Sequence, residues 1–198
     1  MSGKFMKRSS YFLGLILIAN VAFAEQPADG RESWYLYWGL GGAAITYPKG
    51  VQEAIDIIED VDGVQRTTIS IDMLGFYFPL TPKTIGGVVI NSAGDRFDYE
   101  DTWFQWNQFL YGASVIHYVG QRFGQGPFLR ADAGLAKMNY QNSEDNSIDS
   151  ENGFGALVGG GISFDLGGTR ILLNLNYSFR KVEGDNYQII GFSVGGLF

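Results

Sequence analysis

The chain has 198 residues, 14 of them basic and 21 acidic, and its formal net charge is −7. This acidic balance argues against a nucleic-acid binder, because neutralising phosphates requires clustered lysine and arginine. Cysteine is absent, which excludes a disulfide framework and a thiolate metal site. The 28 glycines and the 15% aromatic content favour β-structure over helices, which glycine weakens.

An export signal is predicted for residues 1–24. A basic stretch from Lys4 to Arg8 precedes an apolar run from Tyr11 to Ala24 that ends in Ala-Phe-Ala. This order is typical of a cleavable signal peptide. The alternative is a membrane anchor helix, but the apolar run is interrupted and shorter than the roughly 20 residues that a spanning helix needs. Cleavage after Ala24 leaves one domain, residues 25–198, with 11 basic residues, 21 acidic residues and a charge near −10.

Eight segments of alternating pattern follow the short polar leader from Glu25 to Glu32, and such alternation indicates β-strands. The clearest runs from Arg170 to Arg180. There the apolar residues Ile171, Leu173, Leu175, Tyr177 and Phe179 lie opposite Leu172, Asn174, Asn176, Ser178 and Arg180. Segments Leu129–Ala136 and Ile189–Phe198 share this design. The others are Thr68–Tyr77 and four glycine-rich or apolar segments: Trp34–Tyr47, Thr84–Ser92, Trp103–Tyr118 and Phe154–Asp165.

In the segment Thr68–Tyr77 we expect one face to hold Ile69, Ile71, Met73 and Tyr77, and the other to hold Asp72 with Leu74 and Phe76. Alternation alone leaves open whether an apolar face meets lipid or encloses a ligand, as in a soluble lipocalin-like barrel. The lengths of the connections between segments favour the interpretation in which the apolar face meets lipid. Long connections follow segments one, three and five (Pro48–Gln65, Ala93–Thr102, Gln141–Gly153), and shorter ones follow two, four, six and seven (Pro79–Lys83, Val119–Gly126, Leu166–Thr169, Val182–Asn186). Short periplasmic turns and long outside loops are typical of a transmembrane antiparallel up-and-down β-barrel with periplasmic termini.

The last segment ends at an aromatic residue, Phe198, after the apolar face of Phe192 and Val194. With the export signal and the eight strands, this ending resembles the outer-membrane β-barrel domain family, whose familiar small members are OmpA/OmpX-type eight-stranded barrels. The resemblance implies an all-β fold in the bacterial outer membrane. It also implies contact with outer-membrane lipid and lipopolysaccharide, and a role for Phe192, Val194 and Phe198 as the signal read by the barrel-assembly machinery.

Charged residues fall on the predicted inner faces. Asp72, Arg130, Asp132 and Arg180, with Asp165 as a further candidate, would form a structural charge network in the lumen, where a charge is tolerated only if it is paired. The interior of an eight-stranded barrel is just wide enough to be filled by side chains, so no large open pore is expected. No cofactor is expected either.

The single histidine bears on a possible enzyme, because some small barrels modify lipid A with a histidine near the outer leaflet. His117 is predicted at the periplasmic end of its strand, and Ile116-His117-Tyr118 lacks the His-x-Ser arrangement of the deacylases. We therefore predict that no residue is catalytic.

The predicted outside loops are acidic. Carboxylates occur in the first (Glu53, Asp56, Glu59, Asp60, Asp62), the second (Asp95, Asp98, Glu100, Asp101) and the third (Glu144, Asp145, Asp149, Glu151). They predict a solvated surface, with divalent cations as possible partners. Within the first loop, Val51, Ala54, Ile55 and Ile58 share one face at helical spacing, which predicts a short helix at the barrel mouth.

The leading hypothesis is a non-enzymatic outer-membrane barrel with an envelope structural role or surface loops that interact with partners. The alternatives are a lipid A-modifying enzyme and a soluble periplasmic ligand-binding barrel. Architecture alone does not identify a ligand or a partner.

Overall fold

The computed structural model describes residues 32–120 and 122–198. The predicted export signal lies outside the described residues. The elements in chain order are β1 (Tyr35–Thr46), α2 (Lys49–Glu59), β2 (Gln65–Thr81), β3 (Thr84–Tyr99), β4 (Thr102–Tyr118), β5 (Gly126–Asn142), β6 (Ser147–Asp149), β7 (Gly153–Asp165), β8 (Arg170–Val182) and β9 (Asp185–Leu197). In the described part of the chain, no helix is long and apolar enough to cross a membrane.

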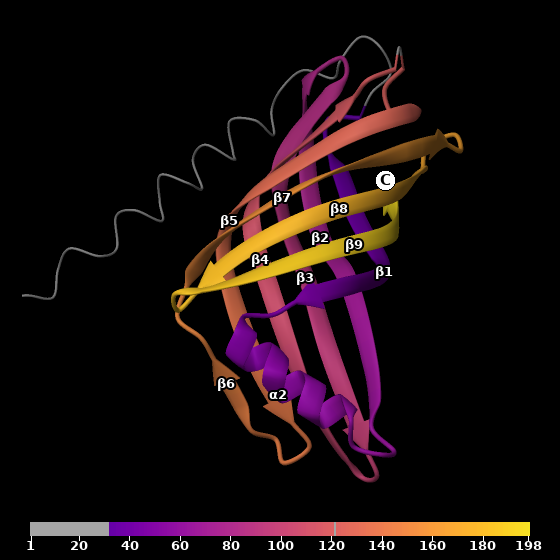
Figure 1. Cartoon of the computed structure of the whole chain (residues 1–198). Helices are drawn as coiled ribbons and strands as arrows, with labels where there is room; N and C mark the ends of the chain where they lie inside the picture. Colours follow the sequence, from indigo (N-terminus) through magenta and orange to yellow (C-terminus); the bar gives the residue numbers. More distant parts are fainter. Residues whose placement is uncertain (1–31, 121) are drawn as a thin grey trace, which may run out of the picture.

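Eight of the strands close into one antiparallel barrel (Figure 1). Each strand pairs with its neighbour in sequence, except that β5 pairs with β7, and β6 is a short strand beside the end of β5. The first and last strands complete the circle, with a register running from Tyr37 opposite Leu197 to Thr46 opposite Gln188. Where these pairings run, closure leaves the barrel body without an unpaired edge. The predicted eight-stranded up-and-down barrel is confirmed.

The period-two pattern divides the wall into an apolar outside and a more polar inside. On β8 the residues Leu173 and Leu175 are exposed, whereas Asn174 and Asn176, which alternate with them, are buried. The same arrangement holds on β5 and β9, as the alternation predicted. Exposed leucine beside buried asparagine is the reverse of what a soluble globular domain shows.

A β-bulge makes one of the predicted faces wrong. Asp72 pairs with Asn91 and Leu74 pairs with Ile90, so Met73 is an extra residue in β2. The insertion reverses the alternation beyond it, because two residues then oppose one on the partner strand. Tyr77 is therefore fully buried on the inner face with Asp72, although the period-two pattern placed it on the opposite face.

Strands β2 to β5 continue beyond the rest of the barrel at one end. Residues 65–69 of β2 have no partner in β1, and residues 137–142 of β5 have none in β7. We call this extension, residues 65–69, 94–99, 102–107 and 137–142 with β6, the flap; Figure 1 shows it with α2 lying across it. The opposite end, which holds Tyr35 and Leu197, is called the terminus end.

The flap corrects the prediction that Ala93–Thr102 is a long loop. Strand β3 runs on to Tyr99, and β4 begins at Thr102 after a tight turn in which Glu100 has a φ of 50°. Sixteen consecutive pairs, from Thr84 with His117 to Tyr99 with Thr102, join the two strands. Asp95 and Asp98 therefore lie on a strand, and only Glu100 and Asp101 form the turn.

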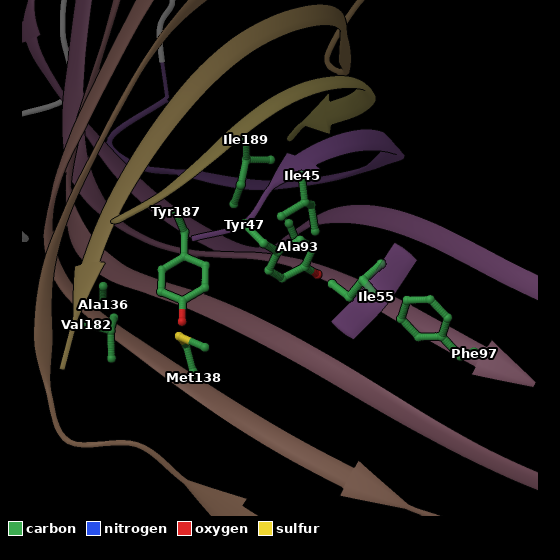
Figure 2. Close-up of a cluster of buried hydrophobic side chains, with 10 residues drawn as sticks. All are labelled: Ile45, Tyr47, Ile55, Ala93, Phe97, Ala136, Met138, Val182, Tyr187 and Ile189. Carbon is green, nitrogen blue, oxygen red and sulfur yellow. The ribbon is translucent and has the colours of Figure 1, made fainter. Parts of the chain in front are cut away.

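The short helix predicted in the first connection is confirmed as α2, which begins at Lys49 and ends at Glu59. Its apolar side faces the flap. Ile55 is 2% exposed, and Val51 and Ile58 pack beside it against the inner side of the sheet. Figure 2 shows Ile55 next to Phe97 of β3. Burial of this face holds α2 in place, since most helical stability in proteins comes from packing of an amphipathic face.

Candidate functional site: the sealed polar lumen and the helix-capped flap

Arg130 of β5 is the centre of the polar lumen. Its Nη1 and Nη2 atoms donate to the two oxygens of Asp72 at 2.8 and 2.7 Å, and Nη2 and Nε donate to Oδ2 of Asp132 at 2.6 and 3.0 Å. All three side chains are at most 2% exposed. Arg130 and Asp132 lie two residues apart on the inner face, and Asp72 approaches from β2. Such charge-assisted, bidentate contacts are among the strongest hydrogen bonds in proteins.

Neutral polar groups complete the shell around the two carboxylates. The Tyr37 hydroxyl and the Asn91 amide donate to Asp72 at 3.0 and 3.1 Å. Ser114 donates to Asp132, and its hydroxyl lies 2.7 Å from that of Tyr77. The guanidinium of Arg130 also lies over the Tyr37 ring, 5.4 Å from its centre. The carboxylates are thus bonded on several sides, as buried charges require.

Arg180 joins this cluster through an amide rather than through an ion pair. It donates to Oδ1 of Asn91 and to the backbone carbonyl of Gln108, and among the described residues it forms no ion pair. Asn91 donates in turn to Asp72, so one side-chain amide links the arginine to the carboxylate. Two arginines and two aspartates make this lumen belt formally neutral.

The structure therefore gathers Asp72, Arg130 and Asp132 at one point, attaches Arg180 to them and leaves Asp165 outside. Asp165 is exposed at the end of β7, where its carboxylate accepts from the Gly167 amide, so the suggestion that it faces the lumen is wrong. Sequence reasoning missed Asn91, whose strand has no clear alternation. It also missed the hydroxyls of Tyr37 and Tyr77. The alternation along a strand shows which face a residue lies on, but it does not show which residue of another strand it contacts.

Apolar and aromatic side chains close both ends of the lumen. At the terminus end, the buried cluster is Tyr35, Tyr37, Tyr77, Ile85, Ile116, Tyr118, Phe128, Leu172 and Leu197. Arg170 lies over the rings of Tyr35 and Phe123, at 5.1 and 5.0 Å from their centres. At the flap end, Figure 2 shows the second cluster: Ile45, Tyr47, Ile55, Ala93, Phe97, Ala136, Met138, Val182, Tyr187 and Ile189. The charged belt lies between these two plugs.

A second ion-pair cluster fastens α2 to the flap. Arg66 of β2 donates from Nη1 to Glu59 of the helix at 3.0 Å and from Nη2 to Asp95 of β3 at 2.6 Å. Asp95 also accepts from the hydroxyls of Tyr47, at 2.6 Å, and Thr68. Hydrogen bonding to Asp95 raises the pKa of Arg66, and burial raises the pKa of Tyr47. The prediction that Asp95 belongs to a solvated loop is wrong, since this residue is 0% exposed.

The outer wall changes character where the flap begins. Over the barrel body, large apolar residues face outward, such as Leu40, Leu129 and Leu175 with 54%, 59% and 60% exposure. On the flap, a row of paired residues across the four strands reads Thr67, Arg96, Gln105 and Gln141. The polar groups there bond to one another along the surface, as when Lys137 reaches Asp149 at 2.6 Å and Arg96 reaches Asp98 at 2.8 Å.

His117 lies on the outer face near the end of β4 that is remote from the flap. It is exposed, and its Nδ1 atom lies 2.9 Å from the Thr84 hydroxyl. The predicted position of His117 near the end of its strand is confirmed. Within residues 32–120 and 122–198, no three histidine or carboxylate side chains are grouped as a metal site requires.

Comparison with known proteins supports the architecture. No protein-family model and no curated protein matches the chain. Among solved structures, the Neisserial surface protein A (NspA) aligns with a TM-score of 0.57 at 15% identity, over 85% of this chain and 98% of that one. Ail, the attachment invasion locus protein of Yersinia pestis, gives 0.46 at 13% identity, over 85% of this chain and 100% of its own. The similarity to NspA shows the fold alone, a closed eight-stranded barrel of the outer-membrane type; the lower score adds no argument.

Proposed function

We propose that the chain is a non-enzymatic integral protein of the bacterial outer membrane, which holds a closed barrel in lipid and displays the flap with α2 outside the cell. Its surroundings are outer-membrane lipid and lipopolysaccharide, and it reaches them through the barrel-assembly machinery. The role is structural or interactive, carried by the displayed flap, and no large pore runs through the lumen.

The change along the outer wall carries this proposal. Leucines on the outside of the barrel body would be costly in water, at roughly 25 cal/mol per Å² of apolar surface, and stabilising in lipid. The polar row that contains Arg96 would be costly in lipid, where an arginine at the midplane of a barrel costs about 2–4 kcal/mol. The apolar body thus suits a bilayer, and the flap suits water. Closure of the wall satisfies the backbone groups that hydrocarbon leaves without partners.

The exposed histidine argues against the enzyme alternative. His117 contacts a threonine hydroxyl, and it lies at the end remote from the flap. In the proposed orientation this is the periplasmic side, away from the outer leaflet. The lumen arginines and aspartates are enclosed between two plugs, where no substrate would reach them.

Cysteine labelling tests the location and the orientation together, because the chain contains no cysteine. Asp145→Cys marks the exposed turn after β5, and Pro82→Cys marks the turn between β2 and β3 at the opposite end. In intact cells of a Gram-negative host, a membrane-impermeant maleimide is expected to label only the Asp145→Cys protein. After lysis both variants should react. The protein should sediment with the outer membrane and require detergent for extraction.

The result that overturns the proposal is equally clear. Recovery of the folded protein in a detergent-free periplasmic extract would assign it to the soluble barrels. Labelling of Pro82→Cys alone on intact cells would reverse the orientation, and the flap would then lie in the periplasm.

A further inference from the structure

The flap contains a hollow that the proposed function does not use. The hollow has a volume of about 220 Å³ and lies between the chain that leaves α2 and the β3–β4 hairpin. Ile58, Val61 and Val64 form one side, and Phe97, Tyr99 and Phe104 form the other. It is separate from the lumen belt, and none of its lining residues is charged.

Aromatic faces dominate the sheet side of this hollow. Phe97 and Phe104 stack with their ring centres 4.6 Å apart and nearly parallel, at 9°. Tyr99 and Val61 remain 41% and 45% exposed at the opening, so apolar surface faces the solvent. Because α2 is fastened through Glu59 and Arg66, the two sides are held apart by a fixed element.

Negative charge surrounds the opening. Asp60 and Asp62 flank Val61, while Glu100 and Asp101 form the turn between Tyr99 and Thr102. Within the described residues, these four carboxylates form no ion pair, whereas the nearby Arg66 and Arg96 are already paired with Glu59, Asp95 and Asp98. The opening therefore attracts cations and repels anions.

We propose that this hollow binds a small amphipathic organic cation, in which one aromatic ring or branched alkyl group carries an ammonium. The volume of the hollow limits the size of the ligand. Sites for drug-sized ligands usually measure about 300–1,000 Å³, and this smaller hollow holds a single ring. The apolar part enters between Val64 and Phe104, and the ammonium stays at the opening beside the carboxylates. Arg66 and Arg96 already lie over the rings of Phe97 and Trp103, so the selection of a cation rests on the carboxylates at the opening. The inference uses only the flap, so it stands apart from the membrane location.

The test is a titration of the purified full chain in a nonionic detergent with three probes of similar shape: 2-phenylethylammonium, 2-phenylethanol and phenylacetate. Trp103 lines the hollow and supplies a fluorescence signal, which a Trp103→Phe variant should remove. We expect the cation to bind at least about tenfold more tightly than the anion, with the alcohol between them. Raising the salt concentration from about 0.01 to 0.5 M should lower the affinity for the cation severalfold, because exposed charges are screened.

Two variants separate the apolar part of the site from its charged opening. Val64→Phe fills the hollow and should abolish binding of all three probes. Glu100→Asn with Asp101→Asn should remove most of the preference for the cation; asparagine is chosen because Glu100 has a positive φ that asparagine tolerates. The matched control is Glu144→Gln with Asp145→Asn, which removes the same charge from another turn and should change nothing.

Equal affinity for the three probes in the unaltered protein would overturn the charge selection. Binding that survives Val64→Phe in a protein with an unaltered circular-dichroism spectrum would overturn the site. A loss of selectivity in the control variant equal to that at Glu100 and Asp101 would show a general effect of net charge and would also overturn it.

Discussion

At the scale of single residues, the Arg130 cluster determines how much of the lumen's stability depends on charge. Removing one partner of a buried ion pair leaves the other charge without compensation, at a cost of about 3–5 kcal/mol. We expect Arg130→Ala and Asp72→Ala each to lower the free energy of unfolding by this order, and the double variant to lose much less than the sum. Urea unfolding in lipid vesicles measures the cycle.

Lys181→Ala is the control for that cycle, because Lys181 is exposed at the end of β8. It should change the unfolding free energy by less than about 0.5 kcal/mol. A coupling energy near zero between Arg130 and Asp72 would contradict the prediction and mean that water or other groups compensate each charge separately.

Adjacent glycines on β1 give a second prediction, since they face opposite sides of the wall. A Cβ at Gly41 would lie 1.7 Å from the carbonyl oxygen of Phe192, whereas a Cβ at Gly42 would meet nothing within 4 Å. Gly41→Ala should push β1 away from β9 and reduce the yield of folded barrel. Gly42→Ala should be neutral or stabilising by up to about 1 kcal/mol, because alanine restricts the unfolded chain. Cold gel migration and urea unfolding compare the two, and equal effects would mean that the strands separate easily.

At the scale of elements, β6 is held against β5 by hydrogen bonds to Asp149. Lys137 donates to it at 2.6 Å and Asn139 at 2.8 Å. Both bonds lower the pKa of Asp149 below its ordinary value, and the bond from Lys137 has the larger effect. A carboxyl with a lowered folded pKa stabilises the fold above its unfolded pKa, about 4, and the effect disappears as pH falls through the folded pKa.

An NMR titration of the Asp149 carboxyl is therefore expected to give a midpoint below the ordinary value. Lys137→Ala should raise that midpoint, whereas Lys181→Ala should leave it unchanged. Because both partners are exposed, the effect on global stability should be small, but exchange protection of the β6 amides should fall at low pH. An unchanged midpoint in Lys137→Ala would show that the bond does not persist in solution.

Elements differ in how far sequence predicts them. Helix α2 was predictable because its apolar residues recur at helical spacing, and β5, β8 and β9 because every inner residue alternates with an outer one. The flap was not, since Asp95, Asp98 and Glu100 have the composition of a loop. Arg66 pairs with Asp95 and Arg96 pairs with Asp98 on the same sheet, which becomes visible only when the strands are paired.

The candidate sites show the same limit. The alternation of inner and outer residues predicts that Arg130, Asp132 and Arg180 face inward. The hydrogen bonds by which Asn91 links Arg180 to Asp72 depend on closure of the barrel. The bulge at Met73 leaves Asp72 on the inner face and moves Tyr77 there, although the alternation has no visible break. Sequence therefore predicts which residues line the lumen better than which of them meet.

At the scale of the whole molecule, Phe198 joins the two ends of the barrel wall. Its amide donates to the Leu36 carbonyl at 2.9 Å, and its carbonyl accepts from the Leu36 amide at 3.0 Å. The ring stacks on Trp38 at 6.5 Å, and a Cβ at Gly196 would lie 2.6 Å from it. Because an eight-stranded barrel is complete only when β9 meets β1, we expect Phe198→Ala to reduce the folded, heat-modifiable species in cells. Phe198→Tyr should preserve it, and equal yields of the two variants would contradict an assembly role.

The last prediction concerns conductance. An ion crossing the barrel would have to pass the aromatic plug at Tyr35 and Tyr77, the bonded belt around Arg130, and the cluster that contains Ile55. An eight-stranded barrel offers an interior that side chains can fill, and here they fill it from both ends. Purified protein in planar bilayers should therefore show no large, long-lived openings between pH 5 and 8. Brief channel openings can arise only if one of the plugs moves. The double variant Tyr35→Ala with Tyr77→Ala should therefore increase the frequency of brief openings. Reproducible large openings from the unaltered protein would mean that the plugs are mobile or that several chains form a shared pore, and either result would contradict the prediction that no large pore exists.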